Sequence, residues 1–263
     1  MITAGQLWYT LFIRIICHQY SFSSTEVRIS PVKTRTYPKI TNLGKTLAHI
    51  ACASACRSIV DRLLEEGMLI EETDGDGLYP VQVAMMHKNK PALEALLGRG
   101  ARLRSTTWQT AIDCYPEALF VLFSKLMDDA GILFRKKRFE DAMHRLHYAL
   151  NKCEMCKKTE QLQDMQSGIL KVRQQIIMSI ARVLRRQGRT QQAIDICASL
   201  EANACEQIRF ECHLLRAKCH FDLQDMELAK AHVQEAIRLR PDHDEARHLL
   251  NTLVLPCTNI ARL

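Results

Sequence analysis

The chain has 263 residues, of which 47% are hydrophobic and 25% are charged, and it contains only 10 Gly and 7 Pro. This composition is typical of a globular protein with a buried core and excludes a long linker-like chain. The formal net charge is +7, but residues 1–40 hold five basic residues and one acidic residue, so the remainder is nearly neutral. Nucleic-acid binding normally requires a concentrated basic stripe, and we therefore expect no nucleic-acid partner.

Residues 1–41 contain the only strongly apolar run, LWYTLFIRIIC at 7–17. Arg14 interrupts this run, which is too short to span a bilayer, and no basic start precedes it as in a signal peptide. We expect a poorly ordered leader at 1–41 and no integral membrane span. The 11 cysteines form an odd set without a regular framework, which predicts reduced, mostly buried thiols in the cytosol or nucleus.

Residues 42–103 repeat with a period of 33 residues. Each copy predicts a turn, a short helix, and a second helix that ends in paired leucines and a glycine. Glycine favours the left-handed conformation that closes a helix. The aligned positions are Gly44 with Gly77, Ala51 with Ala84, 63–64 with 96–97, and Gly67 with Gly100.

The segment GKTLAHIACA at 44–53 resembles the opening of an ankyrin repeat, G-x-T-P-L-H-x-A. The resemblance implies that His49 ties backbone groups of neighbouring turns by hydrogen bonds, which is a structural role. The second copy keeps Pro80 but has Tyr79 and Gln82 where the motif has Thr and His. QTAIDCY at 109–115, followed by PEALFVLFSKL, resembles a third, degenerate copy. We therefore expect an ankyrin array over 42–123.

Three pairs of alanines, each pair twelve residues apart, mark the following part of the chain: Ala130 and Ala142, Ala181 and Ala193, Ala217 and Ala229. A small residue in each of two antiparallel helices lets their backbones approach closely, so each pair predicts a helical hairpin. The hairpins resemble tetratricopeptide repeats. Successive copies lie 51 and then 36 residues apart, against about 34 in the ideal unit. We expect three such repeats over 124–254, with an insertion near 153–168. A cap helix at 242–254 would begin at Asp242 or Asp244, and a tail would follow at 255–263.

Ankyrin repeats followed by three tetratricopeptide repeats resemble the TANC/rolling-pebbles scaffold family over residues 42–254. FEDAMHRLHYALNKC at 139–153 and VQEAIRLRPDHDEARHLL at 233–250 carry the closest likeness. The resemblance implies an all-α helical-repeat solenoid. It also implies a cytoplasmic, non-enzymatic scaffold or adaptor that works without a cofactor. A fragment of a larger scaffold is a further possibility.

Tetratricopeptide arrays hold extended peptides on the concave face formed by the first helix of each pair. The helix phase set by the alanines places three basic side chains there, beside apolar ones. Arginine holds a carboxylate by two parallel hydrogen bonds, so this face predicts an acidic or C-terminal peptide segment as the ligand. The same basic residues also fit an ordinary solvated helix face. The expected groove residues are Met178, Arg182, Arg185, Leu214, Lys218 and Phe221, with Met127, Gly131, Phe134, Gln175 and Glu211 on the same side.

The alternative to a peptide groove is a zinc- or thiol-dependent regulator that uses His144, His147, Cys153 and Cys156, which fall within thirteen residues. Two histidines and two cysteines are a common tetrahedral zinc set. Against this reading, both histidines flank Arg145 on a solvated helix face, and the chain would need to turn back within five residues. The sequence contains neither a phosphate loop nor a G-x-S-x-G nucleophile elbow, and we expect no enzymatic activity.

Overall fold

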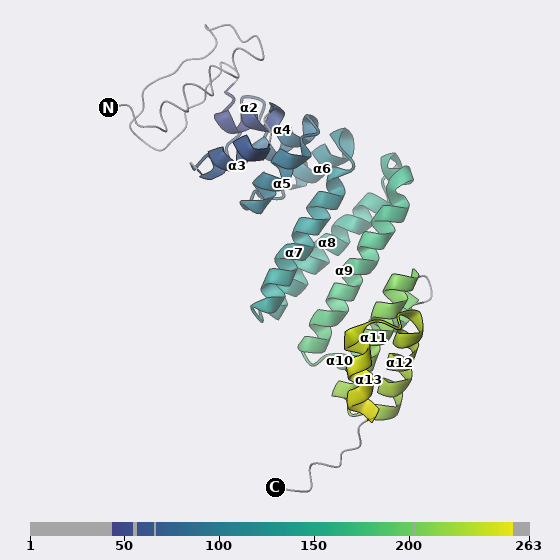
Figure 1. The fold of residues 1–263 in the computed structure, drawn as a ribbon. Coiled ribbons are helices and arrows are strands. Elements are labelled where there is room, and N and C mark those ends of the chain that lie inside the picture. Colours follow the sequence, from purple (N-terminus) through teal and green to yellow (C-terminus); the bar gives the residue numbers. More distant parts are fainter. Residues whose placement is uncertain (1–43, 55–56, 66, 202–203, 255–263) are drawn as a thin grey trace, which may run out of the picture. The chain divides into compact units, whose positions relative to one another are not determined.

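The structure is a computed structural model and describes residues 44–54, 57–65, 67–201 and 204–254. The expected leader at 1–41 and tail at 255–263 lie outside these residues. The described residues form twelve α-helices, α2 to α13, one 3-10 helix, η1, and no strand (Figure 1). The expected all-α class is confirmed. The chain divides into two compact units, Met1–Val121 and Leu122–Leu263.

In the first unit, short helices alternate between two stacked rows. One row contains α2, α4 and α6, in which α4 packs against both others, and the second row contains α3 and α5, which pack together. The buried faces carry Leu, Ala and Val, whereas charged residues face outward, as an amphipathic helix requires. The helices are α2 (Leu47–Ser54), α3 (Arg57–Glu65), α4 (Pro80–Met86), α5 (Lys90–Gly98) and α6 (Ser105–Cys114).

The 33-residue period is present in the backbone of the first unit. Gly67 and Gly100 follow the second helix of each copy with φ of 88° and 91°. In both copies the residue after the glycine donates its N–H to the carbonyl of the first of the paired leucines, at 3.0 Å. This is the left-handed helix ending expected from the glycines, and the prediction is confirmed. A side chain at either position would strain the backbone.

His49 links two successive turns of the first unit through both of its ring nitrogens. Nε2 lies 2.8 Å from the carbonyl oxygen of Leu78, which only accepts, so Nε2 carries the proton and donates it. Nδ1 then accepts from the N–H of Thr46 at 3.1 Å, and the Thr46 hydroxyl lies 2.8 Å from it. Burial lowers the pKa of His49 and keeps the ring neutral. The predicted hydrogen-bonding role is confirmed.

Gln82 and Thr107 occupy the place of His49 in the next two helix pairs. The Gln82 side chain accepts from the N–H of Tyr79 at 3.1 Å and donates to the hydroxyl of Thr110 at 3.0 Å. The Thr107 hydroxyl accepts from the N–H of Arg104 at 3.2 Å. The equivalent residues are therefore 33 and then 25 residues apart. The segment 109–115, expected in a third copy, lies in the second half of α6 and the residue after it.

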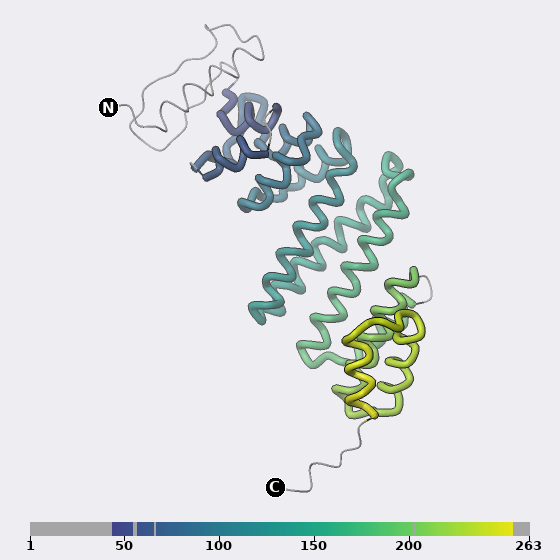
Figure 2. The backbone as a smooth tube through the Cα atoms, viewed as in Figure 1, coloured from purple at the N-terminus to yellow at the C-terminus, as the bar shows by residue number. Residues whose placement is uncertain are grey.

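The second unit continues as a series of helical hairpins. α8 packs against α9, α9 against α10 and α11, α11 against α10 and α12, and α12 against α13. The tube in Figure 2 reverses direction between successive helices. The elements are α7 (Ala118–Arg135), which begins in the first unit, α8 (Phe139–Lys157), η1 (Glu160–Met165), α9 (Gln166–Arg186), α10 (Thr190–Glu201), α11 (Glu206–Asp222), α12 (Met226–Leu239) and α13 (Asp244–Val254).

The alanine pairs and the hairpin turns share one spacing. All six paired alanines are at most 3% exposed, as the close helix approach required. Lys137, Gly188 and Gln224 turn the three hairpins with φ of 60°, 79° and 62°, and they lie 51 and 36 residues apart, like the alanines. The residues of the expected insertion at 153–168 complete α8, form η1 and begin α9. They therefore lengthen two helices and add the short 3-10 helix η1 between them.

The last helix of the described residues, α13, covers an apolar core that it shares with α11 and α12. The start of α13 differs from expectation, because neither aspartate provides the predicted cap. Instead, Nδ1 of His243 lies 3.4 Å from the N–H of Ala246, while Asp242 pairs with Arg247 at 2.9 Å. The core contains Phe210, Leu214, Ala217, Val233, Ala236 and Ala246.

Candidate functional site

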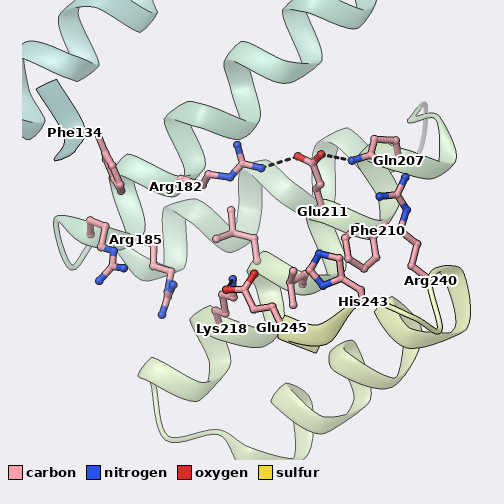
Figure 3. A pocket seen from close by; sticks show the side chains of 13 residues that line it. Phe134, Arg182, Arg185, Gln207, Phe210, Glu211, Lys218, Arg240, His243 and Glu245 are labelled. Atoms are coloured by element: carbon pink, nitrogen blue, oxygen red, sulfur yellow. Dashed lines mark hydrogen bonds and ion pairs between the residues drawn. The ribbon is translucent and has the colours of Figure 1, made fainter. Parts of the chain in front are cut away.

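A pocket of about 380 Å³ lies in the second unit between α9, α11 and the start of α13 (Figure 3). This volume falls within the usual range for ligand sites, roughly 300–1,000 Å³. Phe210, Leu214 and Leu215 of α11 line it and are almost fully buried. The other lining residues are Phe134, Arg182, Arg185, Arg186, Gln207, Glu211, Lys218, Arg240, His243 and Glu245.

Three of the six expected groove residues bring positive charge to this pocket. Arg182 and Arg185 project from α9 and Lys218 from α11, so the predicted convergence of these cations is present. They share one side because residues three and four apart on a helix lie on the same face, and α9 packs against α11. Leu214 contributes to the buried lining between them.

Two expected groove residues do not reach the pocket. Met178 is 0% exposed, and its sulfur lies 3.5 Å from the sulfur of Cys212. The α9–α11 contact covers the face that we expected to be open, so the placement of Met178 in the groove was wrong. Phe221 is half-buried on α11 and does not line the pocket. Of the five neighbours expected on the same side, Phe134 and Glu211 line the pocket, whereas Met127, Gly131 and Gln175 do not.

Each of the three predicted cations has an acidic partner within the protein, which sequence reasoning missed. A ligand carboxylate would therefore compete with an existing ion pair. Hydrogen bonding by Lys218 lowers the pKa of Glu245 and keeps that carboxylate charged. Figure 3 shows Arg182 joined to Glu211, which Gln207 also contacts. The pairs are Arg182–Glu211 at 2.6 Å, Arg185–Asp222 at 2.6 and 3.0 Å, and Lys218–Glu245 at 2.5 Å.

Two further arginines on the pocket were also missed. Arg186 ends α9, is exposed, and forms no ion pair with any described residue. Arg240 follows α12, and its guanidinium lies 5.1 Å from the ring centroid of Phe210. The His243 ring packs on the same phenyl group, with centroids 4.7 Å apart. The lining thus contains five cationic and two acidic side chains, and the pocket keeps a net positive charge.

The structure does not bring together the residues of the alternative zinc site. His144 and His147 are exposed on α8, whereas Cys153 and Cys156 are 0% exposed on the buried face of the same helix. Burial raises the pKa of Cys153 to about 12 and that of Cys156 to about 11, which disfavours the thiolates that zinc requires. Within the described part of the chain, no group of three or more His, Cys, Asp or Glu side chains is placed to hold a metal ion.

The cysteines of the described residues are free thiols, as expected. Six of these eight are buried, Cys114 is half-buried, and Cys205 is exposed. Cys197 and Cys212 are hydrogen-bonded to each other in the core, which raises the pKa of Cys197. Burial raises the pKa of Cys52 to about 12 and that of Cys219 to about 11. Cys52 and Cys219 are therefore packing groups in the core.

No known protein-family model matches this chain. Among the helices that the structure describes, none combines the length and the apolar character needed to cross a membrane.

Proposed function

We propose that this chain is a non-enzymatic scaffold or adaptor whose second unit binds an extended peptide, acidic or C-terminal, in the pocket between α9, α11 and α13. The first unit would be a short ankyrin array and the second a set of tetratricopeptide repeats, in a cytoplasmic protein of the TANC/rolling-pebbles type. Support for the repeat types comes from the 33-residue period of glycine-closed helices and from the alanine-spaced hairpins.

The observation that carries the peptide proposal is a buried apolar lining surrounded by arginines. Phe210 and Leu214 offer contact to an apolar peptide side chain, and the guanidinium groups of Arg186 and Arg240 lie on the same pocket. Arginine can bind a carboxylate through two parallel hydrogen bonds, and nearby apolar groups exclude water from such a contact. An extended segment that alternates apolar and acidic side chains fits this combination.

The three cations that have an acidic partner within the protein differ in how exposed their ion pairs are. An exposed ion pair contributes only about 0–1 kcal/mol, so a ligand carboxylate can replace the internal one. The Arg182 side chain is 48% exposed, and Glu245, the partner of Lys218, is 59% exposed, so both pairs are open to exchange. Arg185 is 19% exposed and is held by both oxygens of Asp222. We therefore assign Arg182 and Lys218 to the ligand and Arg185 to holding α9 against α11.

The proposal is tested by selecting peptides from a display library on the full chain and measuring their affinity by fluorescence anisotropy. Arg186→Gln combined with Arg240→Gln should weaken binding at least tenfold, because both guanidinium groups lie on the pocket. Neither change breaks an ion pair between described residues, so the lower affinity would report the loss of contacts with the ligand. The matched control is Arg209→Gln, which removes an exposed arginine of α11 that does not line the pocket. Equal affinity for the double variant and the wild type would refute the pocket as the binding site.

Comparing a free with an amidated peptide C-terminus distinguishes binding of the terminal carboxylate from binding of internal acidic side chains. Amidation of the peptide C-terminus should abolish binding if the terminal carboxylate is held, and should leave it unchanged if acidic side chains are held. A selection that yields only basic or uncharged peptides would contradict the positive character of the site.

A further inference from the structure

Three histidines gather on α11 and α12, away from the residues that line the peptide pocket. His213 and His220 lie two turns apart on α11, and both approach His232 on α12. The ring centroids of His213 and His232 are 5.6 Å apart, and those of His220 and His232 are 5.4 Å apart at an interplanar angle of 17°. Nδ1 of His213 lies 3.3 Å from Nδ1 of His232.

Glu201 at the end of α10 determines which nitrogen of His213 carries the proton. Nε2 of His213 lies 3.0 Å from a carboxylate oxygen of Glu201, which only accepts, so Nε2 donates its hydrogen there. In the neutral ring, Nδ1 of His213 therefore carries a lone pair directed toward Nδ1 of His232, from which it can accept a hydrogen bond, and a metal ion would take the place of that hydrogen. Orientation of one ring nitrogen by a carboxylate is what proteins commonly provide behind a metal-binding histidine.

The distance between the two Nδ1 atoms matches that between two ligands of one metal ion. Histidine nitrogens bind Zn²⁺ at about 2.0–2.1 Å, and two of them at the tetrahedral angle are then about 3.3 Å apart. We propose that Nδ1 of His213 and Nδ1 of His232 form a two-histidine site for a divalent transition-metal ion of the Zn²⁺, Ni²⁺ or Cu²⁺ class. Water would complete the coordination, since no third His, Cys, Asp or Glu in the described residues is placed to do so.

The surrounding charges decide which ions can enter. Arg216 lies beside the cluster and repels cations, but its guanidinium is 2.7 Å from the second oxygen of Glu201, which offsets that charge. Asp225 lies 3.8 Å from Nδ1 of His220, on the outer side of the cluster. An ion must bind imidazole strongly enough to outweigh the remaining repulsion from Arg216. Mg²⁺ and Ca²⁺ prefer oxygen ligands and are therefore excluded.

The histidine cluster is partly open to solvent, as a water-completed site requires. The side chains of His213 and His220 are 13% and 12% exposed, and His232 is half-buried. His220 stacks on His232 and limits the rotation of that ring away from His213. This site does not depend on the peptide proposal, because none of the three histidines lines the pocket.

The test is a titration of the chelator-treated full chain with Zn²⁺ in reducing buffer, followed by calorimetry and by nitrogen NMR of the histidine rings. We expect one equivalent to bind and to shift the Nδ1 resonances of His213 and His232. His232→Gln should weaken binding by more than tenfold. Glu201→Gln, which removes the orienting charge but keeps the ligands, should weaken it by about 10–100-fold. Excess Mg²⁺ should not compete.

The surface pair on α8 provides the matched control. Changing His144→Gln together with His147→Gln removes two exposed histidines three residues apart and should leave the affinity unchanged. If this variant loses binding instead, the surface pair is the site and the proposal is overturned. Unchanged affinity in His232→Gln, or unshifted Nδ1 resonances of a folded wild type at millimolar Zn²⁺, would also overturn it.

Discussion

Replacing Phe210 by alanine should release α13 from the second unit. Phe210 is 2% exposed and belongs to the core that contains Val233 of α12 and Ala246 of α13. A buried aromatic side chain removes about 150–250 Å² from water, which at about 25 cal/mol per Å² is worth about 4–6 kcal/mol. Core Phe→Ala changes cost about 3–5 kcal/mol. Because this ring also lines the pocket, water can enter the vacated space, and we expect a loss near 3 kcal/mol.

The assay combines urea unfolding, followed by circular dichroism, with hydrogen exchange of the backbone amides. Exchange should accelerate most in α13, because the Phe210 ring contacts His243 and the core beneath Ala246. Amides of α9 should remain protected, since a helical array loses its terminal element first. Phe221→Ala is the control, because Phe221 is half-buried on the same helix and lies outside this core; it should cost less than half as much.

A loss below about 1 kcal/mol for Phe210→Ala would show that this ring does not anchor the core, because such changes typically cost about 3–5 kcal/mol. Unaltered exchange in α13, with the unfolding curve shifted, would refute the claim that the ring holds that helix.

Three further outcomes are expected. Burial lowers the pKa of His232 from 6.5 in the unfolded chain to about 4 in the folded protein. Below pH 6.5 the ring is therefore protonated in the unfolded chain but not in the folded protein, and the free energy of unfolding decreases as the pH falls from 6.5 toward 4. Urea unfolding at pH 5 should show about 1–2 kcal/mol less stability than at pH 7.5, and His232→Gln should remove this part of the difference. Gly188→Ala should cost about 1 kcal/mol, because φ at this position is 79°, whereas Gln224→Ala should change thermal stability little, because Gln224 already adopts φ of 62° with a side chain. In iodoacetamide, mass spectrometry should find the exposed Cys205 alkylated long before Cys153, whose pKa burial raises to about 12.

Much of the fold was predictable because the residues that carry it have few alternatives. Gly67 and Gly100 adopt a backbone conformation that other residues avoid, and buried alanines mark close helix contacts. The role of Thr107 in the third helix pair was not predictable, because a threonine there takes the place of the recognisable histidine. A threonine hydroxyl can accept the same N–H, but nothing in the sequence marks that substitution.

The candidate site was predictable only as a set of positive charges. Helix phase gives the side from which Arg182 and Lys218 project, but it does not give their partners. Glu211 lies 29 residues from Arg182, and Glu245 lies 27 residues from Lys218, so only the packing of α9, α11 and α13 brings the pairs together. Arg240 could not be found from helix phase, because it lies in the turn after α12 and outside the first helix of each pair.

Photo-crosslinking of a bound peptide tests directly whether the pocket between α9, α11 and α13 is the binding site. A peptide selected on the full chain would carry a photoreactive group at its apolar anchor, and mass spectrometry would identify the attachment sites. We expect crosslinks to the pocket residues of α9, α11 and the start of α13, including Phe210 and Leu214. Crosslinks confined to the first unit, or to the outer faces of α8 and α12, would contradict it.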